Sequence, residues 1–179
     1  LGAVVAWQCL RGRMVASRAM KTIQHFLLIW LLGLPGFVQS AALQLQTGIG
    51  AIPASGYLQR LDAPHAVLTA QQALHAEGWQ ALPSSLSAGY TNAYVWLRLE
   101  IRPSDAGEQR WMLRLSNALL DDVRLYQRDA EGIWQERRSG ENLARELWPI
   151  DYRSAVFPLR LQGQQNEVVL LRLHSKNAL

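Results

Sequence analysis

Cysteine is almost absent from this sequence. Cys9 is the only one among 179 residues, and it lies in an N-terminal segment that we expect to be removed. The remaining chain then has neither a disulfide nor thiol chemistry. A chain of about 139 residues must in that case be held together by its hydrophobic core, in which it can bury roughly two-thirds of its surface, so we expect a single domain.

A basic surface is lacking as well. The formal net charge is +4, but Arg11, Arg13, Arg18 and Lys21 account for all of it. From residue 41 onward the basic and acidic side chains are equal in number. The excess charge therefore belongs to the N-terminal segment, and we expect no nucleic acid as a partner.

After residue 40 the sequence also lacks any apolar run long enough to cross a bilayer. One earlier run, residues 26–34, is short and apolar, and it follows Met20 and Lys21. This order is typical of a secretory signal peptide, which we expect to be cut after Ser40 or, as a second choice, after Ala42. An uncleaved membrane anchor is the competing interpretation.

Three segments follow from this pattern. We expect residues 1–19 to be upstream read-through, residues 20–40 to be the signal peptide and residues 41–179 to be a domain exported to the periplasm.

Strand patterning dominates the exported part. In residues 94–101 an aliphatic set alternates with an aromatic and charged set, which is the period of a strand with one face in a core. Short runs separated by turn residues argue for an all-β, jelly-roll-like sandwich. The expected strands are 43–46, a short edge strand at 57–61, 93–102, 110–116, 122–128, 133–137, 154–161 and 167–174.

One short helix is expected among these strands. Thr69 and Gln72 have the spacing of a capping box, and Gly78 stands where a helix C-terminus favours glycine. These signals predict a helix over residues 70–77, with Leu74 and Trp79 as its contacts to the sandwich.

Several segments in a fixed order resemble the second type of extracellular domain of the seven-transmembrane receptors with diverse intracellular signalling modules (7TMR-DISM). The resemblance begins near Tyr57 and runs to the end of the chain. It rests on Gly89-Tyr90-Thr91, Tyr94-Val95-Trp96-Leu97-Arg98, Arg110-Trp111-Met112-Leu113, Ser116-Asn117, Leu120-Asp121, Val123, Leu125-Tyr126, Ser139-Gly140-Glu141-Asn142-Leu143, Arg153, Val156-Phe157-Pro158-Leu159 and Leu171-Arg172-Leu173-His174-Ser175.

The resemblance implies a non-enzymatic periplasmic sensor, similar to carbohydrate-binding modules, that stands before seven membrane helices. A cytoplasmic output such as a diguanylate cyclase or histidine kinase would follow those helices. The sequence departs from the family in two places: Glu141 stands where an Asp is usual, and the family continues past Ser175 into another strand. We therefore expect a domain truncated before its last strand, either as a fragment or as a disrupted gene product.

Two groups of residues are candidates for binding a small ligand, a carbohydrate or a carboxylated molecule. Trp96 and Arg98 share the non-core face of one strand, where a sugar ring could stack and an arginine could hold oxygens. The alternative is that the helix or a loop covers this face, and that its charges form cross-strand pairs.

The second group lies in the loop before residue 154. Tyr152, Arg153 and Trp148 belong to it, and Glu141 is near in sequence; loops at the end of a sandwich often carry function. The alternative is a loop pinned by one Arg–Glu ion pair.

Catalytic and metal sites are not expected. Asp121 and Asp122 are adjacent, so they point to opposite sides of a strand, and His65, His75 and His174 have no metal-ligand spacing. We expect no cofactor. The sequence is compatible with a homodimer as well as with a monomer. The competing functions are a free periplasmic carbohydrate-binding module and an accessory domain of a secreted enzyme, which the downstream coding sequence would distinguish from a receptor.

Overall fold

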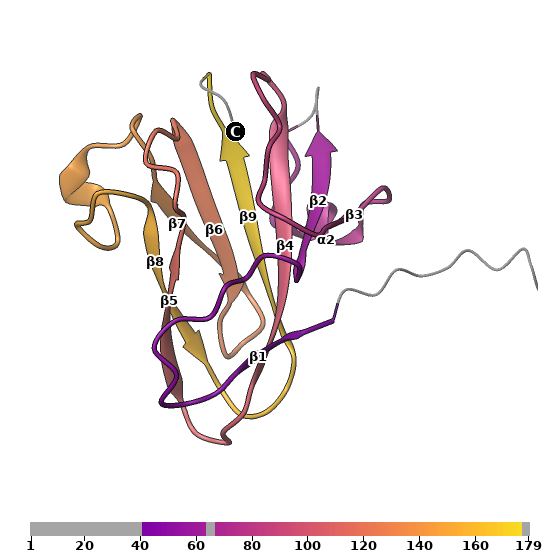
Figure 1. Cartoon of the computed structure of the whole chain (residues 1–179), viewed down its shortest axis with the longest axis vertical. Helices are drawn as coiled ribbons and strands as arrows, with labels where there is room; N and C mark the ends of the chain where they lie inside the picture. The colour runs from indigo at the N-terminus through magenta and orange to yellow at the C-terminus, as the bar shows by residue number, and fades with distance from the viewer. Residues whose placement is uncertain (1–40, 64–66, 177–179) are drawn as a thin grey trace, which may run out of the picture. The chain divides into compact units, whose positions relative to one another are not determined.

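The computed structural model describes residues 41–63 and 67–176 of the chain, which form a β-sandwich with one short α-helix (Figure 1). The expected read-through segment, signal peptide and His65 lie outside the described residues. The all-β sandwich predicted from the alternating pattern is confirmed. The bounds of the elements are β1 Leu43–Leu45, β2 Leu58–Ala63, α2 Ala70–His75, β3 Gln80–Leu82, β4 Tyr94–Pro103, β5 Gln109–Arg114, β6 Asp122–Arg128, β7 Trp134–Ser139, a 3-10 turn at Arg145–Leu147, β8 Val156–Leu161 and β9 Glu167–His174.

Seven strands form the larger sheet: six lie in the order β3-β2-β4-β9-β6-β7, and β1 is added beside β4. Neighbours within the order of six are all antiparallel. Strand β1 pairs in parallel with the last residues of β4, Ile101 to Pro103. The long strands β4 and β9 are therefore central, and they pair along residues 95–101 of β4.

The main core lies between this sheet and the two-stranded sheet β5-β8. The aliphatic set of β4 points into it, because alternate residues of a strand face the same side. Strand β8 contributes Phe157, Leu159 and Leu161 to the same core. Pro158 lies between them, in an edge strand that pairs only with β5, where the missing N–H costs no ladder hydrogen bond.

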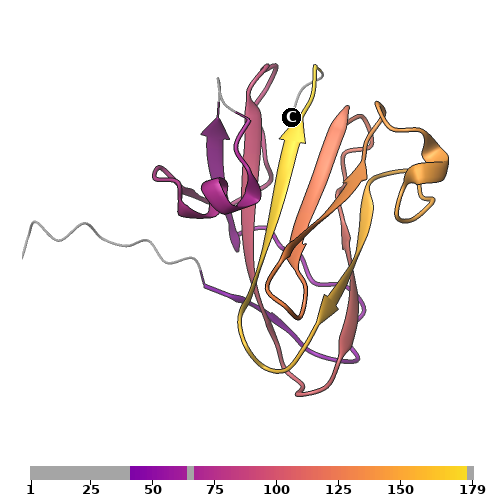
Figure 2. The same ribbon diagram turned by 180° about the vertical axis from the view of Figure 1, so that it is seen from behind.

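Helix α2 covers the other face of the larger sheet (Figure 2). Its capping box is formed as predicted: the Thr69 hydroxyl accepts from the Gln72 backbone N–H at 3.2 Å, and the Gln72 side chain accepts from the Thr69 N–H at 2.9 Å. Leu74 and Trp79 pack against a second hydrophobic cluster on this face, as predicted from the sequence.

Some element boundaries differ from the expectation. The helix ends at His75 with an extended residue at Ala76, so Gly78 takes its positive φ of 92° in the turn beyond rather than at the cap. Strand β2 is flanked on both sides, because β3, which the sequence pattern did not predict, is the true edge. None of the described segments forms a helix with the length and hydrophobicity of a membrane span.

Candidate functional site

Trp96 is completely buried beneath helix α2. It stacks on Tyr126, and both belong to the second hydrophobic cluster together with Leu170. The alternative interpretation, in which the helix covers this face, therefore holds for Trp96. We leave Trp96 out of the proposed binding site because its ring offers no surface to a ligand.

Arg98 lies two residues further along β4 and is half-buried. Its neighbours across the sheet are Gln59 on β2 and Leu170 on β9. Arg98 lines neither the pocket around Trp134 nor the cavity around Leu97, and its role stays a prediction.

Charged residues of the same face form ion pairs between strands, as the alternative interpretation expected: Arg124 pairs with Glu136 on β7, and Asp122 pairs with Arg172 on β9. Arg124 contacts Asp122 at 3.1 Å and Glu136 at 3.2 Å. Its cross-strand neighbours are Arg172 on β9 and Arg138 on β7. We call these three cations the arginine row. Asp122 contacts all three, at 3.3 Å for Arg172 and 4.0 Å for Arg138, and so offsets the repulsion between them.

The loop between β7 and β8 contains the second group of predicted residues. It starts at Gly140, whose φ is +113° and where an added Cβ would lie 2.6 Å from the Asp121 carbonyl oxygen. The next two backbone N–H groups, of Glu141 and Asn142, donate to the Leu120 and Asp121 carbonyls at 2.9 Å. The start of the loop is thus fixed to the segment before β6, and the Glu141 side chain is exposed.

The middle of this loop is organised by Arg145. Its guanidinium pairs with Asp151 at 2.9 Å, donates to the Tyr152 carbonyl and lies 4.4 Å from the centre of the Trp148 ring. The Trp148 indole donates to the Leu143 carbonyl at 3.1 Å. The ion pair that holds the loop is therefore Arg145–Asp151, which the sequence did not point to.

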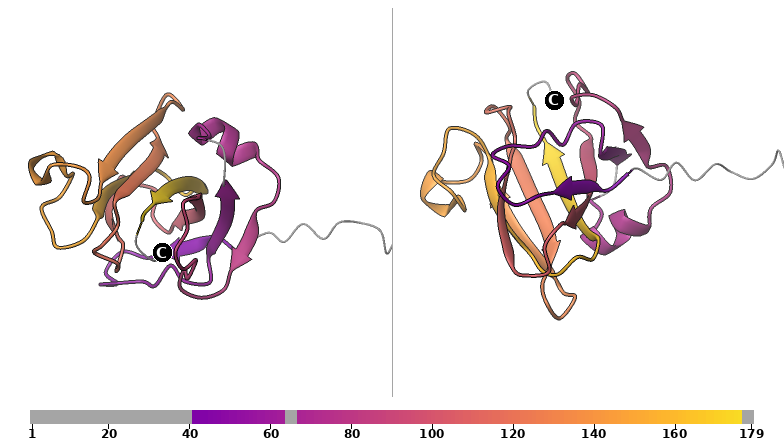
Figure 3. Two further views of the ribbon diagram at one scale, coloured as in Figure 1. Left: turned by 90° about the horizontal axis from the view of Figure 1, so that it is seen from above. Right: turned by 60° about the horizontal axis from the view of Figure 1, so that its bottom comes forward.

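Tyr152 and Arg153 are exposed side chains of this loop, and the Arg153 guanidinium lies 5.9 Å from the Tyr152 ring centre. Within residues 41–63 and 67–176 no ion pair joins Arg153 to Glu141. Figure 3 shows the loop standing well away from helix α2, which covers Trp96. The structure therefore does not bring the two predicted groups together.

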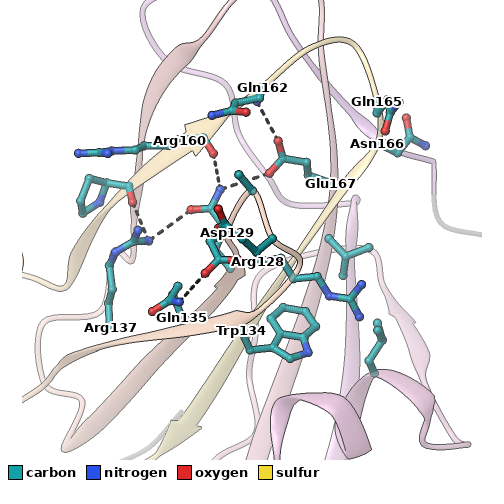
Figure 4. Close-up of a pocket in the computed structure, with 16 residues that line it drawn as sticks. Arg128, Asp129, Trp134, Gln135, Arg137, Arg160, Gln162, Gln165, Asn166 and Glu167 are labelled. Atoms are coloured by element: carbon teal, nitrogen blue, oxygen red, sulfur yellow. Dashed lines mark hydrogen bonds between the residues drawn. The ribbon is translucent and has the colours of Figure 1, made fainter.

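A pocket of about 720 Å³ lies at the opposite end of β7 and β8 from this loop (Figure 4). We call it the edge pocket, because it surrounds the turn between β6 and β7, at the edge of the larger sheet, and reaches the turn between β8 and β9. Its lining residues are Leu74, Gln127, Arg128, Asp129, Ala130, Glu131, Trp134, Gln135, Arg137, Pro158, Arg160, Gln162, Gln165, Asn166, Glu167 and Val168.

Gln127 and Arg137 link the two sheets on the inner side of the edge pocket. Gln127 donates to the Arg160 carbonyl at 2.6 Å, and Arg137 donates from Nη1 to the Pro158 carbonyl at 3.1 Å. These two carbonyls belong to the free edge of β8, so side chains take the place of a neighbouring strand. Burial lowers the pKa of Arg137, and the positive charge of Arg160 lowers it further.

The aromatic part of the pocket lies on the helix side of the same edge. The Trp134 indole donates to Gln71 of helix α2 at 3.1 Å, and the Arg128 guanidinium lies 4.8 Å from the Trp134 ring centre. Leu74 and Val168 complete this apolar wall. The edge pocket therefore combines a ring surface with many amide and guanidinium groups, a composition suited to a hydroxylated or charged small molecule.

Sequence reasoning did not single out Gln127, Trp134, Arg137 or Arg160. One signal could have pointed to the first of them: Gln127 continues the inward positions of Val123 and Leu125 on β6, where the alternation calls for an apolar residue. A buried polar side chain at such a position requires a partner.

A second, smaller cavity of about 310 Å³ opens between the sheets beside the segment that joins β5 to β6. Core leucines such as Leu97 and Leu171 form its floor, and serines such as Ser55 and Ser116 form part of its rim. Its apolar floor suits a polar ligand less well than the edge pocket does. In the described part of the chain no three His, Cys, Asp or Glu side chains are grouped so that they could hold a metal ion.

Two comparisons relate the chain to known proteins. The sequence model of a family described as 7TMR-DISM extracellular 2 matches residues 55–179, which is more than half of the chain. A search of curated proteins finds no match to the chain.

Proposed function

This chain belongs to the 7TMR-DISM extracellular 2 family, a family of extracellular sensor domains of membrane receptors, and we propose that it binds a carbohydrate or a carboxylated small molecule from the periplasm. Binding would be passed through a seven-helix membrane region to a cytoplasmic output, a diguanylate cyclase or a histidine kinase. The chain itself would act by binding rather than by catalysis.

The edge pocket is the observation that supports this proposal most strongly. Its volume of about 720 Å³ lies within the range of about 300–1,000 Å³ that is usual for small-molecule sites. Its amide side chains and its arginines can bind hydroxyl and carboxylate oxygens, and its Trp134 ring offers a surface on which the apolar face of a sugar can stack. We therefore place the ligand in the edge pocket first.

The β7–β8 loop is the second candidate surface. Glu141, Trp148, Tyr152 and Arg153 stay in the proposal there, because Tyr152 and Arg153 present an exposed ring beside an exposed guanidinium. Arg98 and Trp148 are both half-buried, whereas Glu141, Tyr152 and Arg153 are exposed.

A binding screen on the exported chain tests the proposal. Galactose, galacturonate and succinate serve as probes, with thermal unfolding and calorimetric titration as readouts. We expect at least one probe to bind saturably and to raise the midpoint of unfolding, since a ligand at a hundred times its Kd stabilises by about 2.7 kcal/mol.

Two variants then locate the site. Trp134→Ala removes the ring wall of the edge pocket, and we expect it to abolish the binding, whereas Arg153→Ala leaves it intact. Binding that is lost in Arg153→Ala and retained in Trp134→Ala would place the site on the β7–β8 loop. If no probe binds, the proposed ligand classes are wrong. Reading the adjoining coding sequence for seven apolar helices tests the receptor role separately.

A further inference from the structure

Arg137 is a half-buried cation that pairs with no carboxylate among the described residues. Both of its hydrogen bonds come from Nη1 and go to neutral acceptors, the Pro158 carbonyl at 3.1 Å and Gln127 Oε1 at 3.3 Å. Among the described residues its Nε and Nη2 atoms have no acceptor. A guanidinium carries five N–H donors in a fork that fits the two oxygens of a carboxylate.

Two other shielded arginines of the same sheet are neutralised. Arg172 and Arg124, whose side chains are 6% and 24% exposed, both contact Asp122, and Arg124 also contacts Glu136. Removing a cation from water without a counter-charge is costly. Arg137 differs from Arg172 and Arg124 because its guanidinium is shielded and the described part of the chain supplies it with no anion.

A second cation stands beside Arg137. Arg160 lies two residues after Pro158 on β8, and its exposed side chain has no hydrogen-bond or ion-pair partner among the described residues. Figure 4 shows both guanidinium groups on the same side of the edge pocket. The positive charge of Arg160 is close enough to lower the pKa of Arg137. Two like charges thus lie near each other, and an anion bound between them would offset their mutual repulsion.

Of the three acidic residues that line the pocket, Glu131 is exposed, and the other two are engaged by neutral donors instead. Glu167 accepts from Gln127 Nε2 at 3.3 Å and from the Gln162 backbone N–H at 3.0 Å. Asp129 accepts from the Ile133 N–H at 2.8 Å and from Gln135 at 2.6 Å. Neither carboxylate pairs with Arg137 or Arg160.

We propose that Arg137 and Arg160 together bind a carboxylate group of the ligand in the edge pocket. This inference rests on the proposed function and narrows it to acidic ligands. Arg137 is positioned by Gln127 and by the β8 edge, and it presents its remaining N–H groups as a fixed fork. Arg160 would contact the same carboxylate from the exposed side of the pocket. A neutral sugar would leave both guanidinium groups uncompensated.

Acetate is the simplest probe of this site. We would titrate it into the full chain at constant ionic strength, kept with sodium chloride, and follow the Nε–Hε signals of Arg137 and Arg160 by NMR. We expect saturable shifts of both signals with a dissociation constant on the order of 10 mM. Shifts that rise linearly with acetate, or that chloride reproduces, would show an adventitious ion only and overturn the proposal.

Arg160→Gln is the decisive variant, because Arg160 is exposed and makes no hydrogen bond from its side chain among the described residues, so the fold does not depend on it. We expect this variant to weaken acetate binding at least tenfold. Arg102→Gln changes another exposed arginine, on β4 outside the pocket; it is the matched control and should bind as the parent does. Equal binding by both variants would refute the role of Arg160.

The two proposals fail in different ways. If galactose and galacturonate bind equally well and both require Trp134, while acetate leaves Arg137 unmoved, the sensor function stands and the carboxylate site is wrong. If acetate saturates the arginine signals but none of the three screening probes binds, the carboxylate site stands and the ligand classes of the proposed function are wrong.

Discussion

Trp96 stacks on Tyr126 with 5.4 Å between the ring centroids and 27° between the ring planes. The two residues lie on β4 and β6, and β9 runs between these strands. Their stack forms the centre of a second hydrophobic cluster, which helix α2 covers. The larger sheet is therefore buried on both faces along this stretch, so an aromatic residue on the outer face contributes to stability rather than to recognition.

Trp96→Ala should destabilise the domain by about 3–5 kcal/mol, because it removes a completely buried ring. Trp96→Phe should cost much less, since the indole Nε1 is buried without a hydrogen-bond partner among the described residues and its removal leaves no acceptor unsatisfied. Urea unfolding of both variants measures the difference. A Trp96→Ala cost below about 1 kcal/mol would mean that the ring is not part of a core.

Stability should fall steeply in alkali because of Tyr126. Burial and the neighbouring Glu136 raise its pKa from 10.0 to about 12. Above pH 10 the unfolded chain loses this proton while the folded chain keeps it, so folding becomes less favourable as the pH rises. The loss between pH 10 and 12 amounts to about 2–3 kcal/mol from this residue.

Tyr126→Phe isolates that contribution. The variant cannot ionise at this position, so its stability measured by urea unfolding should fall less than that of the parent chain between pH 9 and pH 12, a range that brackets the raised pKa. Parallel curves for the two proteins would show that Tyr126 ionises normally in the folded state.

Gly140→Ala should destabilise the domain by about 2–4 kcal/mol, because its φ of +113° is nearly restricted to glycine and the new Cβ meets the Asp121 carbonyl. Gly107→Ala, in the turn between β4 and β5, is the control: its added Cβ meets nothing within 4 Å, and we expect a change within about 0.5 kcal/mol. Thermal unfolding compares them. Equal effects would mean that the loop adapts freely at Gly140.

Asp122→Asn should cost about 1–3 kcal/mol, because Asp122 offsets the repulsion within the arginine row and its side chain is only 17% exposed. Asp151→Asn is the matched control, since the Asp151 carboxylate is 84% exposed and pairs with Arg145 alone; we expect at most about 0.5 kcal/mol.

Salt tests whether the effect of Asp122→Asn is electrostatic. At 1 M sodium chloride the repulsion among the uncompensated arginines is screened, so the gap between Asp122→Asn and the parent chain should narrow. A gap that is unchanged by salt would attribute the effect to packing or hydrogen bonding instead of charge.

The helix and most strands could be predicted because their signals are local. The capping box of Thr69 and Gln72 formed as expected, and the strand over residues 122–128 has the expected bounds. Strand β3 has no such signal: its residues Gln80 to Leu82 are exposed or half-buried, and only pairing with β2 makes them a strand.

The edge pocket could not be predicted from the sequence for a related reason. Gln127 and Glu167 lie 40 positions apart in the chain, and they meet only because β6 and β9 are neighbours in the sheet. Arg137 contacts the β8 edge across the sandwich in the same way. Contacts between residues so far apart cannot be predicted from their spacing along the chain.

The sequence by itself determined the family, the alternation that makes a sandwich and the short helix with its cap, since each depends on residues close together along the chain. Only the tertiary structure decided that Trp96 is core, that Arg145 rather than Arg153 holds the β7–β8 loop, and that Arg137 and Arg160 share a pocket. These outcomes depend on which strand edges and faces are covered, and that depends on contacts between distant segments.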